Sequence, residues 1–178
     1  MRFLALLRGI NVGGHNKLPM ADLRALAVEL GYTKVDTYIQ SGNLLFDGQG
    51  AAGRHEAALE AGIQARFGLT IPVLVRSAAQ FQKLPATNPF VAEVATLPQH
   101  VMLLLSKRKP KAGAALALEE RATDGERAQA FAGGLWLHFA NGSGRSKWSP
   151  ALLDKLVGSS ITTRNWNTVL KLIERLGV

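Results

Sequence analysis

The stretch R-G-I-N-V-G-G-H-N-K, from Arg8 to Lys17, directly follows the apolar run Phe3–Leu7. A short apolar run that ends at a charge is typical of a strand buried inside a sheet. The loop that follows carries three glycines and several side-chain donors, so it can present backbone N–H groups and positive charge to an anion. This junction of a buried strand and a glycine-rich loop therefore indicates both the first element of the fold and a candidate site.

The elements after the loop alternate between helix and strand patterns. A proline at a first helical position and an apolar stripe predict one helix, and apolar residues four positions apart predict a second. Between them, two β-rich runs flank the turn Ser41-Gly42-Asn43 and predict a hairpin. The order β-α-β-β-α-β over residues 2–77 predicts a ferredoxin-like half, with both helices on one face of an antiparallel sheet. The expected elements are a strand at Phe3–Leu7, a helix from Pro19 to Leu30, strands at Val35–Gln40 and Leu44–Phe46, a helix at Arg54–Phe67 and a strand at Ile71–Val75.

The second half of the chain begins near an Asn88-Pro89 turn, which marks a subdomain boundary. We therefore expect an α+β fold, with the ferredoxin-like subdomain over residues 1–86 and a second α+β subdomain with C-terminal helices over residues 87–178. An apolar stripe from Trp166 to Leu176 predicts the last helix, and Thr162–Thr168 is interpreted as its front end. The other expected elements are a strand at His100–Ser106, a helix at Ala112–Leu118, strand pieces at Glu120–Thr123, Arg127–Phe131 and Leu135–Phe139, and a helix from Ser149 to Gly158.

Composition limits the classes of function. The formal net charge of +8 over 178 residues favours anionic partners, namely nucleic acid, nucleotides or other phosphorylated molecules. The basic run Lys107–Lys111 is interpreted as a solvated turn, with binding of an anionic partner as the alternative. There is no cysteine and the four histidines are scattered, so we predict no metal site and no cofactor. The apolar runs are shorter than a signal peptide or a membrane span requires, so we expect a cytoplasmic protein with no membrane contact.

Two stretches supply the residues of the candidate site. One is the loop after the first strand, together with the hairpin turn. The other is the front end of the last helix, where free backbone N–H groups and a partial positive charge attract anions. The predicted ligand-binding residues are Arg8, Asn11, Gly13, Gly14, His15, Asn16, Lys17, Ser41, Asn43, Thr163, Arg164, Asn165, Asn167 and Thr168.

The loop does not match the well-known phosphate-binding motifs. Gly9 and Gly14 have the spacing of a P-loop, but His15 stands at the lysine position and no Ser or Thr follows it. The glycine pattern is not a dinucleotide fingerprint either, and an antiparallel sheet is the wrong setting for one. The predicted central strands also lack the exposed aromatic residues of an RNA-binding sheet. An alternative interpretation is structural: the glycines make tight turns, and Arg8, Asn11 and Asn16 hold the loop through hydrogen bonds to backbone.

The combined motifs resemble those of the bacterial domain-of-unknown-function family 1697. The resemblance implies an α+β protein whose N-terminal half is ferredoxin-like and is packed with a second α/β part, and it implies no established activity. Members often carry Lys at the position of His15, which implies a hydrogen-bond donor there. The motifs that carry the resemblance are Leu6–Gly14, Asn16-Lys17, Pro19-Met20, Thr37–Asn43, Asn88–Phe90 and Thr162–Thr168.

Three hypotheses about function follow. The first is a protein that binds a phosphate-bearing ligand, either nucleic acid or nucleotide, through the loop and the helix N-terminus. The second is an enzyme for a small anionic substrate, in which Arg8, Lys17 and Arg164 form a clamp; the sequence shows no recognised catalytic motif. The third is a structural or interaction protein whose motifs serve folding. The sequence predicts no oligomeric state.

Overall fold

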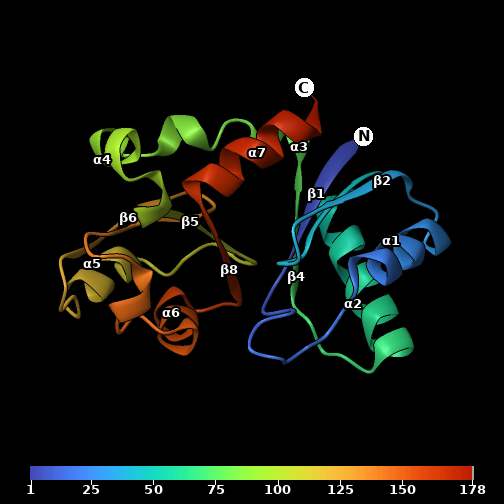
Figure 1. Cartoon of the computed structure of the whole chain (residues 1–178), viewed down its shortest axis with the longest axis horizontal. Helices are drawn as coiled ribbons and strands as arrows, with labels where there is room; N and C mark the ends of the chain where they lie inside the picture. The colour runs from blue at the N-terminus through green and yellow to red at the C-terminus, as the bar shows by residue number, and fades with distance from the viewer. Residues whose placement is uncertain (178) are drawn as a thin grey trace. The chain divides into compact units, whose positions relative to one another are not determined.

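The computed structural model describes residues 1–177, which form two compact units (Figure 1). One unit consists of Met1–Lys83 with residues 172–177, and the other of Leu84–Lys171. Within the described residues there are two four-stranded antiparallel sheets and seven α-helices, which confirms the expected α+β class. None of these helices has the length and apolar character that a membrane-spanning segment requires.

The first unit follows the predicted order of elements. Its sheet has the strand order β2-β3-β1-β4, and every neighbouring pair is antiparallel. Phe3, Ala5 and Leu7 alternate along β1 and pack with the two long helices, which lie on the same face of the sheet (Figure 1). The elements are β1 (Arg2–Leu7), α1 (Met20–Glu29), β2 (Thr33–Tyr38), β3 (Asn43–Asp47), α2 (Ala52–Phe67), β4 (Val73–Ser77) and the short α3 (Ala78–Phe81).

The second unit contains the other sheet, in the strand order β6-β7-β5-β8. Leu104 of β5, Leu118 of α5 and Leu153 of α6 belong to one apolar core, so α5 and α6 cover the same face. The last helix, α7, continues past Lys171 into the first unit. The elements are η1 (Pro85–Thr87), α4 (Val91–Thr96), η2 (Pro98–His100), β5 (Val101–Ser106), α5 (Ala114–Glu119), β6 (Glu126–Phe131), β7 (Gly134–Phe139), η3 (Ser143–Arg145), α6 (Pro150–Val157), β8 (Ile161–Asn165) and α7 (Trp166–Leu176).

The two units repeat one topology. The series β5-α5-β6-β7-α6-β8 has the same order of elements and the same strand order as β1-α1-β2-β3-α2-β4. The hydrogen bonds at the end of the first strand also correspond. The N–H of Arg8 donates to the carbonyl of Pro72 at 3.1 Å, and the N–H of Lys107 donates to the carbonyl of Ser160 at 3.0 Å. The loop at Arg8 in the first unit therefore corresponds to the loop at Lys107 in the second.

Three local predictions were wrong or incomplete. Thr162–Asn165 is part of strand β8 and not of a helix, because its backbone pairs with β5 and its β-branched residues suit a strand. Glu120–Thr123 is not a strand: it lies in the turn that follows α5. Helix α4 was not predicted, since its six residues carry no clear apolar stripe and no side-chain cap.

Candidate functional site

The loop after β1 folds into a small hairpin of its own. The N–H of Asn11 donates to the carbonyl of Asn16 at 3.2 Å, and the N–H of His15 donates to the carbonyl of Val12 at 3.0 Å. The two residues at the tip, Gly13 and Gly14, both have positive φ values, 57° and 79°. Two successive positive φ angles define a type I′ turn, for which glycine is the preferred residue. The glycines of this stretch thus serve a tight turn and do not form a phosphate cradle of the P-loop kind.

Two asparagine side chains fix the shape of this hairpin. Asn11 has a left-handed backbone, and its side-chain amide donates to the carbonyls of Leu18 and Gln40, each at 2.9 Å. Its side-chain oxygen accepts the N–H of Leu18 at 2.9 Å. Asn16, also left-handed, donates to the carbonyl of Gly9 at 3.0 Å. For Asn11 and Asn16, the structural interpretation of the loop is therefore correct, because their side chains form hydrogen bonds to backbone groups and fix the conformation of the loop.

The contact between Asn11 and Gln40 joins the loop to the turn between β2 and β3. Gly42 in this turn has a φ of 79°, and a Cβ there would lie 2.7 Å from Leu7 Cβ and 2.7 Å from Ile10 Cδ1. Only glycine therefore fits between the loop and β1. The buried Asn43 donates to the carbonyl of Tyr38 at 2.8 Å and to the hydroxyl of Ser41 at 3.3 Å. Ser41 and Asn43, predicted as ligand-binding residues, close the hairpin turn.

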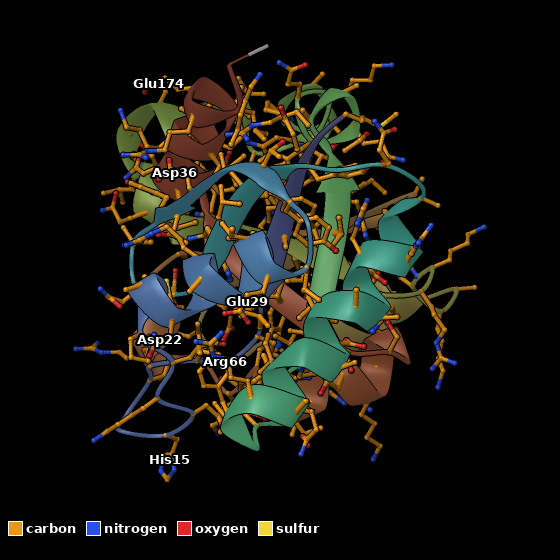
Figure 2. All side chains as sticks on the ribbon, turned by 90° about the vertical axis from the view of Figure 1, so that its right-hand side faces the viewer. His15, Asp22, Glu29, Asp36, Arg66 and Glu174 are labelled. Carbon is orange, nitrogen blue, oxygen red and sulfur yellow. The ribbon has the colours of Figure 1, made fainter. Side chains whose placement is uncertain are left out.

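The basic residues of the loop differ in exposure. His15 and Lys17 are exposed, and Figure 2 shows His15 at the tip of the loop, with its ring pointing away from the rest of the molecule. Arg8 is half-buried. His15 and Lys17 are therefore two basic side chains exposed to solvent on a loop whose backbone conformation is fixed by internal hydrogen bonds.

The second predicted stretch is built differently from the expected helix terminus. Arg164 lies in β8 with 9% of its surface exposed, and its guanidinium donates to the hydroxyl of Thr162 at 2.9 Å and the carbonyl of Thr163 at 2.7 Å. Burial lowers the pKa of Arg164 to about 10. Asn165 is the residue before α7, and its side-chain oxygen accepts the N–H of Thr168 at 2.9 Å. Asn167 is exposed.

The predicted residues are distributed over both units. Those from Arg8 to Asn43 gather at one end of the first sheet, whereas those from Thr163 to Thr168 lie at the junction of β8 and α7 in the second unit. That the two groups form one site stays a prediction.

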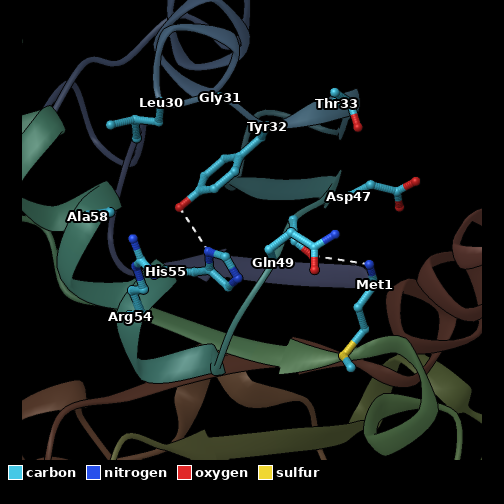
Figure 3. Close-up of a pocket in the computed structure, with 11 residues that line it drawn as sticks. Met1, Leu30, Gly31, Tyr32, Thr33, Asp47, Gln49, Arg54, His55 and Ala58 are labelled. Carbon is cyan, nitrogen blue, oxygen red and sulfur yellow. Dashed lines mark hydrogen bonds between the residues drawn. The ribbon is translucent and has the colours of Figure 1, made fainter.

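A second candidate site, at the other end of β1, was not predicted. A pocket of about 590 Å³ lies beside the turn between α1 and β2 and the start of α2 (Figure 3). His55 contributes to it, and its Nδ1 lies 3.0 Å from the hydroxyl of Tyr32. The sequence signal was the position of His55 in the stripe with Leu59 and Ile63, which marks a polar group on the buried face of a helix. Nothing in the sequence pairs it with Tyr32, because the two are 23 residues apart and belong to different elements.

These features define an α+β protein made of two units of the same topology, with a basic hairpin loop on the first. The chain belongs to the family described as "Protein of unknown function (DUF1697)", whose model matches residues 1–136. It is also similar to a solved structure, that of a conserved bacterial protein from Streptococcus pneumoniae, with 26% sequence identity, a TM-score of 0.74 and coverage of 98% of both chains. The expected family is thus confirmed. A comparison with curated proteins gives no significant match.

Proposed function

We propose that the protein binds nucleic acid, and that the loop Arg8–Lys17 contacts the phosphate backbone. The observation that carries this proposal is the loop itself, a hairpin held rigid by Asn11 and Asn16 that presents His15 and Lys17 to solvent. A rigid loop loses little conformational freedom on binding, so its cations contribute more of their attraction to affinity. The net charge of +8 adds long-range attraction for a polyanion.

The shape of the loop favours nucleic acid over a free nucleotide as the ligand. A type I′ turn that projects into solvent contacts a partner from the outside, whereas a nucleotide needs a concave site that surrounds its phosphates. Cations on a projecting loop are suited to a phosphate backbone, which offers one charge after another along its length. The contribution of the β8–α7 junction, including Asn167 and Thr168, belongs to the same proposal.

We also propose a ferredoxin-like arrangement for the first unit. Its support is the order β-α-β-β-α-β together with the strand order β2-β3-β1-β4 and the position of both long helices on one face. In this arrangement the loop after β1 and the turn between β2 and β3 emerge at the same end of the sheet. That placement brings Asn11 beside Gln40, and it gives the basic loop a firm base.

The experiment compares two lysines that carry the same charge and differ in position. Lys17 lies in the loop, whereas Lys83 is exposed in the segment after α3. Binding of labelled single-stranded RNA and of duplex DNA is measured by fluorescence anisotropy over a range of salt concentrations, for the natural protein, Lys17→Ala and Lys83→Ala. Each lost phosphate contact lowers the slope of log K against log salt by about 1.

The expected result is that Lys17→Ala weakens binding and lowers the salt slope by about 1, whereas Lys83→Ala leaves the slope unchanged. Equal effects of Lys17→Ala and Lys83→Ala would show that attraction depends on net charge alone, and would refute a role for the loop. No affinity for either nucleic acid at low salt would refute the function.

A further inference from the structure

We propose that the pocket beside His55 binds a small molecule that carries a carboxylate or phosphate group. This inference is independent of the proposed nucleic-acid binding, because β1 begins beside the pocket and ends at the basic loop. The pocket volume of about 590 Å³ lies within the range of small-molecule sites. The residues that carry the argument are Tyr32, Asp47, Gly48, Arg54 and His55.

The first observation is a buried donor or acceptor that has no partner. His55 is only 3% exposed, and its Nε2 makes no hydrogen bond within the described residues. The ring is held firmly by other aromatic rings: its centroid lies 4.6 Å from that of Phe3 and 5.3 Å from that of Phe46. Phe46 also stacks on Tyr32 at 4.2 Å. Because an unpaired buried nitrogen is costly, one that persists in a rigid setting indicates a partner outside the chain.

The groups around His55 determine which of its ring nitrogens carries the proton. Burial raises the pKa of Tyr32, so the phenol stays protonated, and burial together with the nearby Arg54 lowers the pKa of His55, so the imidazole is neutral near pH 7. A phenol is a stronger donor than a neutral imidazole, and an imidazole nitrogen is a stronger acceptor than a phenol oxygen. The Tyr32 hydroxyl therefore donates to Nδ1, as its direction in Figure 3 allows, and the ring proton lies on Nε2. The missing partner of His55 is then an acceptor.

The charges at the pocket determine which kind of acceptor fits there. Arg54 is exposed at the pocket, and no carboxylate of residues 1–177 pairs with it. Helix α2 starts at Ala52, and no side chain caps its N-terminus, whose partial positive charge favours an anion. The one carboxylate in the lining, that of Asp47, lies 3.6 Å from Arg2 and 3.3 Å from Lys34, so its charge is offset. The acceptor that fits these surroundings is an anion.

The connection between β3 and α2 controls access to Nε2. A Cβ at Gly48 would lie 2.9 Å from Cε1 and 3.3 Å from Nε2 of His55, so this glycine passes directly over the ring edge. An anion therefore reaches Nε2 only when the segment from Gly48 to Ala51 moves aside. In the bound state the anion accepts the Nε2 proton and faces the guanidinium of Arg54.

The test uses inorganic phosphate and succinate as separate probes, with glycerol as the neutral control. The nitrogen-15 resonances of the His55 ring are followed by NMR while each probe is added, in the natural protein, in Arg54→Ala and in Arg145→Ala. Arg145 is an exposed arginine of the second unit, so its removal changes the net charge equally. Lys17→Ala is measured in parallel, which separates this site from the basic loop.

The expected result is a saturable shift of the Nε2 resonance with phosphate, with succinate or with both, and none with glycerol. A response to phosphate alone assigns phosphorylated ligands, a response to succinate alone assigns carboxylates, and a response to both supports the anion class. Arg54→Ala should weaken binding about tenfold, the loss of one charge-assisted contact, while Arg145→Ala and Lys17→Ala leave it unchanged. If neither anion shifts the resonance, or if Arg54→Ala and Arg145→Ala weaken binding equally, the proposal is wrong.

Discussion

At the scale of single residues, the positions that decide the shape of the loop region are glycines and asparagines with left-handed backbones. As one of two alternatives, the sequence predicted tight turns at the loop glycines together with hydrogen bonds from Asn11 and Asn16 to backbone. It did not distinguish Gly42 from the other glycines. What sets Gly42 apart is a close approach to Leu7 and Ile10, and such a contact between elements leaves no local trace in the sequence.

We predict that Gly42→Ala destabilises the protein more than Gly31→Ala does. The two glycines have similar φ values, 79° and 84°, so each substitution carries a backbone strain of about 1 kcal/mol. At Gly42 the new Cβ would also lie 2.7 Å from Leu7 and Ile10, whereas nothing lies within 4 Å at Gly31. The extra cost at Gly42 should be about 1–3 kcal/mol, as for an overpacked core. Urea denaturation measures both, and equal losses would contradict the close approach.

At the scale of elements, the sequence predicted the strands and helices whose apolar residues recur with a clear period. It did not predict strand β8, which forms by pairing with a distant strand. The apolar stripe of α7 correctly predicted a helix from Trp166 to Leu176, but the sequence analysis also assigned Thr162–Asn165 to the start of this helix. Strand β8 exists because it pairs with β5, and residues as distant as Leu104 and Thr163 face each other there. Arg164 therefore lies in an edge strand of the second sheet. Arg76 in β4, an edge strand of the first sheet, makes the same bond: each arginine donates to the carbonyl of the residue before it, at 2.7 Å and 2.8 Å.

A buried carboxylate holds the turn between α5 and β6, and we predict that it makes stability depend on acid pH. Glu126 accepts the N–H groups of Thr123 at 2.9 Å and Asp124 at 2.8 Å, and the hydroxyl of Ser146 at 2.6 Å. Burial alone would raise its pKa, but these donors outweigh burial and lower the pKa to about 2. The unfolded chain, with an ordinary glutamate pKa, then binds the proton more readily. The stabilisation is present above about pH 5 and is lost as the pH falls towards 2.

Glu126→Gln tests this expectation. The substitution should lower stability at pH 7 by on the order of 2 kcal/mol, because two backbone donors and a hydroxyl lose a charged acceptor. It should also reduce the loss of stability between pH 5 and pH 2.5, since the titrating group is gone. Thermal unfolding followed by circular dichroism across this range measures both effects. A variant whose stability falls with pH as steeply as that of the natural protein would assign the acid sensitivity to other groups.

At the scale of the whole molecule, each unit has the same topology, and this repeat was not evident from the sequence. The prediction of an α+β protein with a boundary near Asn88 required only composition and periodicity. The repeat depends on β8, because without that strand the second unit has no counterpart of β4. Once the units are compared, the basic run Lys107–Lys111 stands where the loop Arg8–Lys17 stands in the first unit. Arg108 in this run donates to the carbonyl of Gly158 at 2.9 Å, so this loop is also held to its own unit.

The repeat leads to a last prediction about nucleic-acid binding. Lys109 is exposed in the second loop, as Lys17 is in the first. If each loop contacts phosphate, Lys109→Ala lowers the slope of log K against log salt by about 1, and the double variant with Lys17→Ala lowers it by about 2. An additive slope is expected if each lysine makes its own phosphate contact. The measurement is the same anisotropy titration, with Lys83→Ala as the control for net charge. A slope that Lys109→Ala leaves unchanged, while Lys17→Ala reduces it, would limit binding to the first unit and give the second basic loop the role of a solvated turn.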